Sequence, residues 1–344
     1  MEYIEIIREN CEKHSRVSWW PKFAFHYTDV TNAIGILSSG YLYSRTNATH
    51  LNMMRNDNAS RQVIDMTSAG VESKVRFYFR PLTPTQYYNE GYKHGSLRYN
   101  HDENANVPVP VFFLFDLDKL LSLPGVHFSE TTQAGHGAKT YSGVEAFSKI
   151  NFDYIYDNSY ENFDTTKNYR HAEIMHPNSL AIETCLHSIL CRNNMDRTTL
   201  LNLLRKEDKL AFERYKDIVK VPKQDVFLQN GLFITECVYH GQFINISFSD
   251  TYASKKYIEI MMRKEGLDEL KPIKVTVHLT WSNSRTVCTQ RSVQTTINIR
   301  DPRGLTLTGV PKVPGAKEII IEVCFDDKLM CYVSQSLESS ELLR

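Results

Sequence analysis

The chain has 344 residues, 42% of them apolar and 23% charged, a composition typical of a soluble globular protein. Its 40 basic and 40 acidic residues give no formal net charge, which excludes the overall basic excess of a tight nonspecific DNA binder. The length is enough for two ordinary domains, and we predict a first domain over residues 1–220 and a second over residues 221–344.

The seven cysteines are scattered along the chain without CxxC pairs or neighbouring histidines. This spacing predicts neither a disulfide framework nor a metal site, and reduced thiols in a cytoplasm are the simpler interpretation. The acidic N-terminus is not that of a signal peptide. No apolar run approaches the ~18 residues that a membrane helix needs, so we expect a cytoplasmic protein without a membrane partner.

In the first 220 residues, short helices and strands are separated by polar loops. Helices are predicted over residues 2–13, from 28 or 29 to 39, from 116 or 118 to 123, and over 143–150 and 196–219. Strands are predicted over residues 23–27, 75–79, 109–115, 126–128, 173–182 and 189–191. Loops are predicted over residues 44–73, 92–107, 129–142 and 153–169.

After Pro222 the pattern changes to strands. Residues 226–248 alternate like a hairpin, with Asn230-Gly231 as its predicted turn. One helix is predicted over residues 251–265. Further strands are predicted over residues 273–281, 286–299, 305–308, 317–325 and 328–334. This succession predicts a small β-sandwich or barrel.

Three short segments carry residues that suit chemistry on a nucleotide. The first is His26-Tyr27-Thr28, directly before a helix that ends at Gly40. The second spans residues 77–87, Phe-Tyr-Phe-Arg-Pro-Leu-Thr-Pro-Thr-Gln-Tyr. The third spans residues 170–175, Arg-His-Ala-Glu-Ile-Met, and places Glu173 in an apolar strand.

These segments, in this order, resemble those of the DarT-type ADP-ribosyltransferases, toxins that modify nucleic-acid bases. The family pattern reads His-x-Thr, then Phe-Tyr-Phe-x-Pro-x-Ser-Pro-Met-Leu-Tyr, then Arg-x-Ala-Glu. The matches span roughly residues 23–193. The resemblance implies an α+β fold, with an ADP-ribosyltransferase-like split twisted sheet and flanking helices, followed here by a mainly β domain.

The resemblance also implies a reaction and its central residues. NAD is the co-substrate, and cleavage of its glycosidic bond passes through an oxocarbenium-like ribose that a nearby carboxylate stabilises. Glu173 is the expected catalytic carboxylate, which also takes the proton from the attacked base. The family has an arginine before its Phe-Tyr-Phe strand, for which Arg61 is preferred here over Arg55.

Five further residues are expected to bind NAD on the strength of the same resemblance. His26 and Thr28 are expected to hold the nicotinamide end. Tyr78, Phe79 and Tyr87 are expected to line the pocket. No metal is implied.

The target and the partners stay open at this point. Thr85-Gln86 replaces the family's Met-Leu, and the loops at 92–107 and 129–142 do not align, so single-stranded DNA and RNA both remain as substrates. A toxin, which could act in phage defence, would need a protein antitoxin or an ADP-ribosyl hydrolase. The second domain would recognise that partner, a chaperone or a phage protein.

Each motif also has a simpler interpretation. Glu173 alone would be a solvent-facing strand carboxylate, His26 a core histidine, and Thr28 a helix cap. The alternative functions are transfer to a protein or to an RNA 2′-phosphate, and a non-catalytic binding module on a degenerate transferase scaffold.

Overall fold

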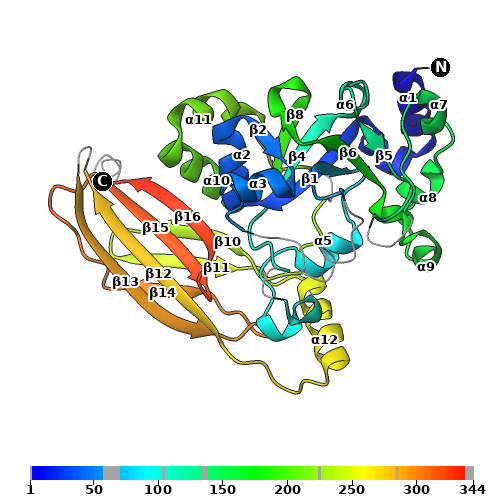
Figure 1. Cartoon of the computed structure of the whole chain (residues 1–344). Coiled ribbons are helices and arrows are strands. Elements are labelled where there is room, and N and C mark those ends of the chain that lie inside the picture. The colour runs from blue at the N-terminus through cyan, green and yellow to red at the C-terminus, as the bar shows by residue number, and fades with distance from the viewer. Residues whose placement is uncertain are drawn as a thin grey trace.

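The structure is a computed structural model, and it describes residues 2–56, 70–102, 105–133, 138–223, 226–283 and 286–337. A mixed seven-stranded sheet with flanking helices forms the first part, and further β-sheets form the C-terminal part (Figure 1). The predicted α+β class with a mainly β C-terminal region is confirmed. No described helix is both long and apolar enough to cross a membrane.

The first sheet has the strand order β5-β6-β3-β1-β4-β8-β9 and is antiparallel except between β8 and β9. Its strands are β1 (Phe23–Asp29), β3 (Lys74–Tyr78), β4 (Pro110–Asp116), β5 (His127–Phe128), β6 (Glu173–Pro177), β8 (Leu186–Cys191) and β9 (Val219–Lys220). A separate two-stranded sheet pairs β2 (Tyr41–Tyr43) with β7 (Ser179–Ala181).

Ten α-helices surround these strands in the described residues before residue 220. They are α1 (Tyr3–Lys13), α2 (Val30–Ser39), α3 (Arg45–His50), α5 (Pro84–Asn89), α6 (Leu117–Leu121), α7 (Val144–Phe147), α8 (Phe152–Tyr156), α9 (Phe163–Thr166), α10 (Asn194–Glu207) and α11 (Lys209–Tyr215). Short 3-10 helices span Ser15–Val17, Trp20–Lys22, Gly95–Leu97, Tyr99–His101, Tyr169–His171, Ile182–Thr184 and Lys216–Ile218.

The first sheet is nearly divided between β1 and β3. β1 pairs with β4 along its whole length, whereas it pairs with β3 only where Phe25 lies opposite Tyr78. β3 in turn pairs with β6 over five residues. The sheet therefore opens between β1 and β3, as a split sheet does.

Helix α2 begins and ends where the sequence predicts. The Asp29 carboxylate accepts a hydrogen bond from the Thr31 backbone N–H at 2.9 Å, which satisfies one of the free amides of the first turn. Gly40 ends the helix with a φ of 73°, in the left-handed region that glycine adopts without strain.

Three predictions of local structure are wrong. The predicted loop at 44–73 contains α3, and the predicted loop at 153–169 contains α8 and α9. The predicted helix over 196–219 is two helices, because the Asp208 side chain accepts hydrogen bonds from the Leu210 and Ala211 amides and starts α11.

The predicted hairpin turn at Asn230-Gly231 is also wrong. The hairpin joins β10 (Ile234–Tyr239) to β11 (Phe243–Phe248), so its turn lies at His240–Gln242. Gly231 instead packs against the first part of the chain, where a Cβ atom would lie 2.4 Å from the Glu90 carbonyl oxygen. The glycine is required by this close approach of two backbones.

The C-terminal part contains two sheets and one long helix, α12 (Tyr252–Glu265). One sheet has the order β10-β11-β14, with β14 at Leu305–Thr308. The other has the order β13-β12-β15-β16 and consists of β12 (Ile273–Ser282), β13 (Val287–Ile297), β15 (Glu318–Phe325) and β16 (Lys328–Ser336). Their inner side chains share one hydrophobic core, which agrees with the predicted sandwich.

The two parts of the chain are joined through buried contacts. Helix α10 packs against β16, where the Tyr332 backbone N–H donates to the Thr199 hydroxyl at 3.1 Å (Figure 1). Tyr92 and Leu97 belong to the core of the C-terminal part although they precede residue 220. The domain boundary at residue 220 stays a prediction.

Candidate active site

A cavity of about 470 Å³ lies where the first sheet opens between β1 and β3. Residues of β1, α2, β2, α3, β3, α5 and β6 line it. This volume is in the usual range for sites that bind small molecules. The division of the sheet thus produces a site between strands that are distant in the sequence.

Glu173 is held in this cavity by an arginine from the neighbouring strand. The Arg76 guanidinium donates from Nε to Oε2 at 2.6 Å and from Nη2 to Oε1 at 2.5 Å. The pairing of β3 with β6 places Tyr78 directly opposite Glu173, so Arg76 reaches the carboxylate from two residues along β3. Both carboxylate oxygens are engaged by one planar fork.

The two members of this pair differ in exposure. The Glu173 side chain is 2% exposed, whereas that of Arg76 is 34% exposed. Burial alone would lower the pKa of Arg76, but the Glu173 carboxylate outweighs it and the net effect raises that pKa. Arg76 therefore stays charged beside the buried Glu173 carboxylate.

Two histidines near the pair are neutral at neutral pH. Burial lowers the pKa of His26 to about 4, and burial together with the Arg76 charge lowers that of His171 to about 4. His26 Nδ1 lies 3.0 Å from the Arg76 carbonyl oxygen, which can only accept. The neutral His26 ring thus carries its proton on Nδ1 and leaves Nε2 as an acceptor.

The family model for "ssDNA thymidine ADP-ribosyltransferase, DarT" matches residues 25–221. The chain belongs to the DarT family. It is an NAD-dependent ADP-ribosyltransferase that acts on DNA, and the predicted family, enzyme class and co-substrate are confirmed. No curated protein matches the chain in sequence.

Three solved DarT structures are similar to the chain. Thermus sp. 2.9 DarT in complex with carba-NAD+ is 14% identical, covers 60% of this chain and 98% of its own, and has a TM-score of 0.44. The same protein in complex with ADP-ribosylated ssDNA is 15% identical, covers 60% of this chain and 96% of its own, and has a TM-score of 0.44. Thermosipho africanus DarTG in complex with ADP-ribose is 12% identical, covers 63% of this chain and 53% of its own, and has a TM-score of 0.43.

Of the residues predicted from the DarT resemblance, four line the cavity together: His26, Thr28, Tyr78 and Glu173. Thr28 is buried on β1, two residues after His26. Burial and the nearby Glu173 carboxylate raise the pKa of the Tyr78 hydroxyl, so it stays protonated. The structure therefore brings these four DarT positions to one place.

Phe79 and Tyr87 do not line the cavity. Side chains alternate along β3, so Phe79 faces the hydrophobic core, where it packs against Phe147 and Phe152. Tyr87 on α5 packs against Tyr257 of the C-terminal part. The expectation that these two residues line the pocket is not met, and Tyr88 lines it instead.

Neither arginine expected from the DarT resemblance is found at the cavity in the described residues. Arg61 lies outside the described residues. Arg55 pairs with Glu207 of α10, at 3.0 and 2.9 Å, and does not line the cavity. Among the described residues, the arginine that contacts Glu173 is Arg76, which was not one of the predicted site residues. Its signal was its position two residues before Tyr78 on the same face of a strand.

Aromatic and basic side chains from β2, α3 and β3 also line the cavity. The Tyr41 and Tyr43 rings stack with centroids 5.9 Å apart, and Tyr41 is exposed. Arg45 and Lys74 add positive charge beside them. Such a combination suits a ligand with phosphates and bases.

Proposed function

We propose that Glu173 is the catalytic carboxylate that transfers ADP-ribose from NAD+ to thymine in single-stranded DNA. The C–N bond between nicotinamide and the ribose breaks, and nicotinamide leaves with the bonding electron pair. A nucleophilic atom of the base forms the new bond to the ribose carbon, and its proton passes to Glu173. The products are ADP-ribosylated DNA and neutral nicotinamide.

The observation that carries this proposal is the bidentate contact of Arg76 with Glu173 inside the cavity. A nearly buried carboxylate stabilises developing positive charge strongly, because little water screens it. Arg76 fixes the orientation of that carboxylate through two hydrogen bonds. Each oxygen retains a second lone pair for a ribose hydroxyl or for the proton of the base.

The residues present also fit NAD+. The unprotonated Nε2 of His26 can accept from the amide N–H of nicotinamide, and Thr28 lies beside it on the same strand. Arg45 and Lys74 offer positive charge to the diphosphate or to DNA phosphates. The stacked Tyr41 and Tyr43 offer a surface for a base.

We further propose that the enzyme is a toxin, which agrees with its membership of the DarT family. Unrestrained base modification would block replication, so a host would need an antitoxin or a hydrolase that removes the modification. The β-sandwich after residue 220 is the proposed contact for that partner. Its surface is separate from the cavity residues.

The substrate test uses the purified full-length chain with NAD+ labelled in its adenylate phosphate. Single-stranded oligonucleotides with and without thymine, the same sequences as RNA, and a protein mixture are offered separately. We expect label only on the thymine-containing DNA. Label on RNA or on protein would overturn the proposed target and leave the enzyme class in place.

The test includes two glutamate variants. Glu173→Gln should lower transfer by about 10³-fold, while Glu183→Gln should leave it unchanged. Glu183 is exposed, does not line the cavity, and forms an ion pair with Arg214 over 2.8 Å. Equal transfer by wild type and Glu173→Gln would overturn the catalytic assignment.

A further inference from the structure

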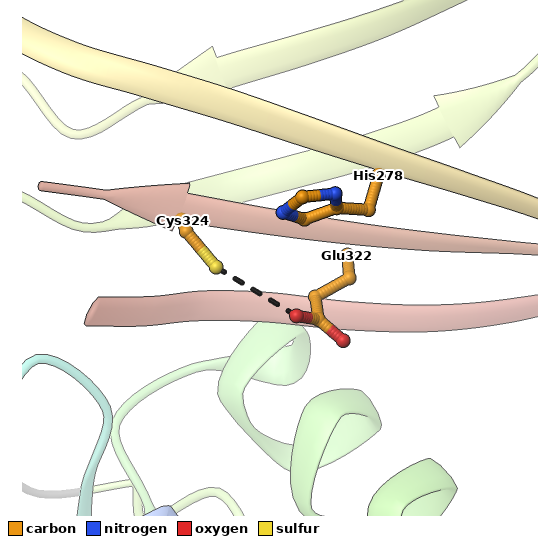
Figure 2. Close-up of side chains that lie close together, drawn as sticks. All are labelled: His278, Glu322 and Cys324. Carbon is orange, nitrogen blue, oxygen red and sulfur yellow. Dashed lines mark hydrogen bonds between the residues drawn. The ribbon is translucent and has the colours of Figure 1, made fainter. Parts of the chain in front are cut away.

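We propose that His278, Glu322 and Cys324 form a zinc-binding site on the outer face of the C-terminal sandwich. The three side chains come from the two central strands of the four-stranded sheet, β12 and β15, and converge as Figure 2 shows. Their donor atoms all lie within 4.8 Å of one another. Nothing in the DarT match covers this part of the chain, because the match ends at residue 221.

Strand pairing brings the three residues together. His278 lies directly opposite Glu322, and Cys324 follows two residues later on the same face of β15. Val277 and Val323, their neighbours along the strands, point into the hydrophobic core. The register of β15 against β12 stays regular through Cys324, so the alternation of side chains keeps Cys324 on the face of Glu322.

The His278 ring is held by a partner that suits metal binding. Its Nδ1 lies 2.8 Å from the Ser292 hydroxyl on β13, which can accept the Nδ1 proton. That arrangement leaves Nε2 with the lone pair that a metal needs. Metal-binding histidines usually donate their other ring N–H to such a second group.

The set of donors favours zinc over other common ions. Imidazole, thiolate and carboxylate are the ligands that Zn²⁺ takes, whereas calcium and magnesium prefer oxygen alone. Tetrahedral zinc separates its ligand atoms by roughly 3.5 Å, given bonds of about 2.0–2.3 Å. Side-chain shifts of about 1 Å would reach that geometry, and water would take the fourth position because His278 is exposed.

Nearby charges permit a cation here. Lys274 is the cation that acts on Cys324, and it is paired with Asp327 at 3.1 Å. Burial, with a contribution from Glu322, raises the pKa of the Cys324 thiol to about 12. Zinc binds the thiolate, so the thiol proton leaves when the metal binds.

The sequence alone gave no indication of this site. Zinc sites are usually recognised from ligands that are close in sequence, whereas His278 lies 44 positions before Glu322 in the numbering. The site exists only because β12 and β15 are paired in this register.

The test measures metal binding to the full-length chain without a histidine tag. Equilibrium dialysis against Zn²⁺ should leave one equivalent bound, and Co²⁺ in its place should show the charge-transfer absorption of a thiolate–cobalt bond. His278→Ala should lose that equivalent and the absorption without unfolding, because His278 is exposed. Ser292→Ala should weaken binding roughly 10-fold.

Two matched controls keep the test decisive. Cys288→Ser removes an exposed thiol on β13, and His240→Ala removes an exposed imidazole at the β10–β11 turn. Both should bind zinc as wild type does. Equal binding by wild type and His278→Ala, or a cobalt complex without thiolate absorption, would overturn the proposal.

Discussion

Among the described residues, two arginine–carboxylate pairs have a carboxylate side chain that is at most 2% exposed, and these pairs differ in what they face. Arg76 and Glu173 meet at the wall of the cavity, with one third of the Arg76 side chain exposed. Arg192 and Asp196 lie 2.9 Å apart with both side chains 1% exposed, and Arg192 also stacks on Phe233.

Burial of a charged pair therefore does not by itself indicate a function. The Arg192–Asp196 pair is sealed where α10 meets the C-terminal part, so its charges act only on the fold. The Arg76–Glu173 pair is buried on the carboxylate side and open on the guanidinium side. A substrate can reach the Arg76–Glu173 pair but not the Arg192–Asp196 pair, and four predictions test this difference.

The largest expected effect is on catalysis by Glu173→Gln. The amide keeps the shape of the side chain but loses the negative charge that stabilises the transition state. We expect kcat to fall by about 10³-fold, the upper range for loss of one preorganised electrostatic group. Turnover is measured as nicotinamide release, with circular dichroism to confirm the fold.

Arg192→Met should affect stability instead. It leaves the Asp196 carboxylate buried without its arginine, which costs about 3 kcal/mol in the free energy of unfolding. Urea denaturation measures this loss, and kcat per folded molecule should stay near that of wild type. A large loss of kcat with unchanged stability would reverse the roles that we give to the two pairs.

Arg76→Met should lower kcat by about 10²-fold. Without the guanidinium, the Glu173 carboxylate loses the two hydrogen bonds that fix its orientation. Turnover is again measured as nicotinamide release. Arg76→Lys, which keeps a charged donor, should restore part of the lost activity.

The smallest effects concern the pH dependence of stability. The folded-state pKa of His26, about 4, lies below the ordinary value of 6.5. Its contribution is therefore full above pH 6.5 and is lost as the pH falls toward 4. The contribution of Asp196 to stability changes with pH in the opposite direction, because burial raises the pKa of its carboxyl group to about 6. Its contribution is full below about pH 4 and is lost as the pH rises through 6.

Urea titrations across this pH range separate the two contributions. His26→Asn should flatten the loss of stability on the acidic side. Asp196→Asn should remove the opposing slope between pH 4 and 6. Unchanged slopes in both variants would show that these buried groups do not titrate as their environments require.

Much of the first part of the chain was predictable from local pattern. The strand at 75–79 and the capped helix before Gly40 follow from alternation and capping, which are local properties. The family resemblance rested on three segments, and His26, Tyr78 and Glu173 from these segments line one cavity. Their roles stay proposals.

The rest required knowledge of which strands pair. Arg76 meets Glu173 only because β3 lies beside β6, although 97 positions separate the two residues. The sequence suggested that Gly231 lies in a hairpin turn. A glycine is needed there because the backbone at Glu90, far away in the sequence, leaves no room for a Cβ atom. Phe79 was expected in the pocket because the family resemblance does not say which face of the sheet its side chain is on.

The central claim is that Arg76 acts on catalysis through Glu173. The most direct measurement is a double-mutant cycle of kcat for wild type, Glu173→Gln, Arg76→Met and the double variant, on thymine-containing single-stranded DNA. The account predicts strong non-additivity, with the double variant no slower than Glu173→Gln alone. Additive losses, or a Glu173→Gln variant as fast as wild type, would contradict it.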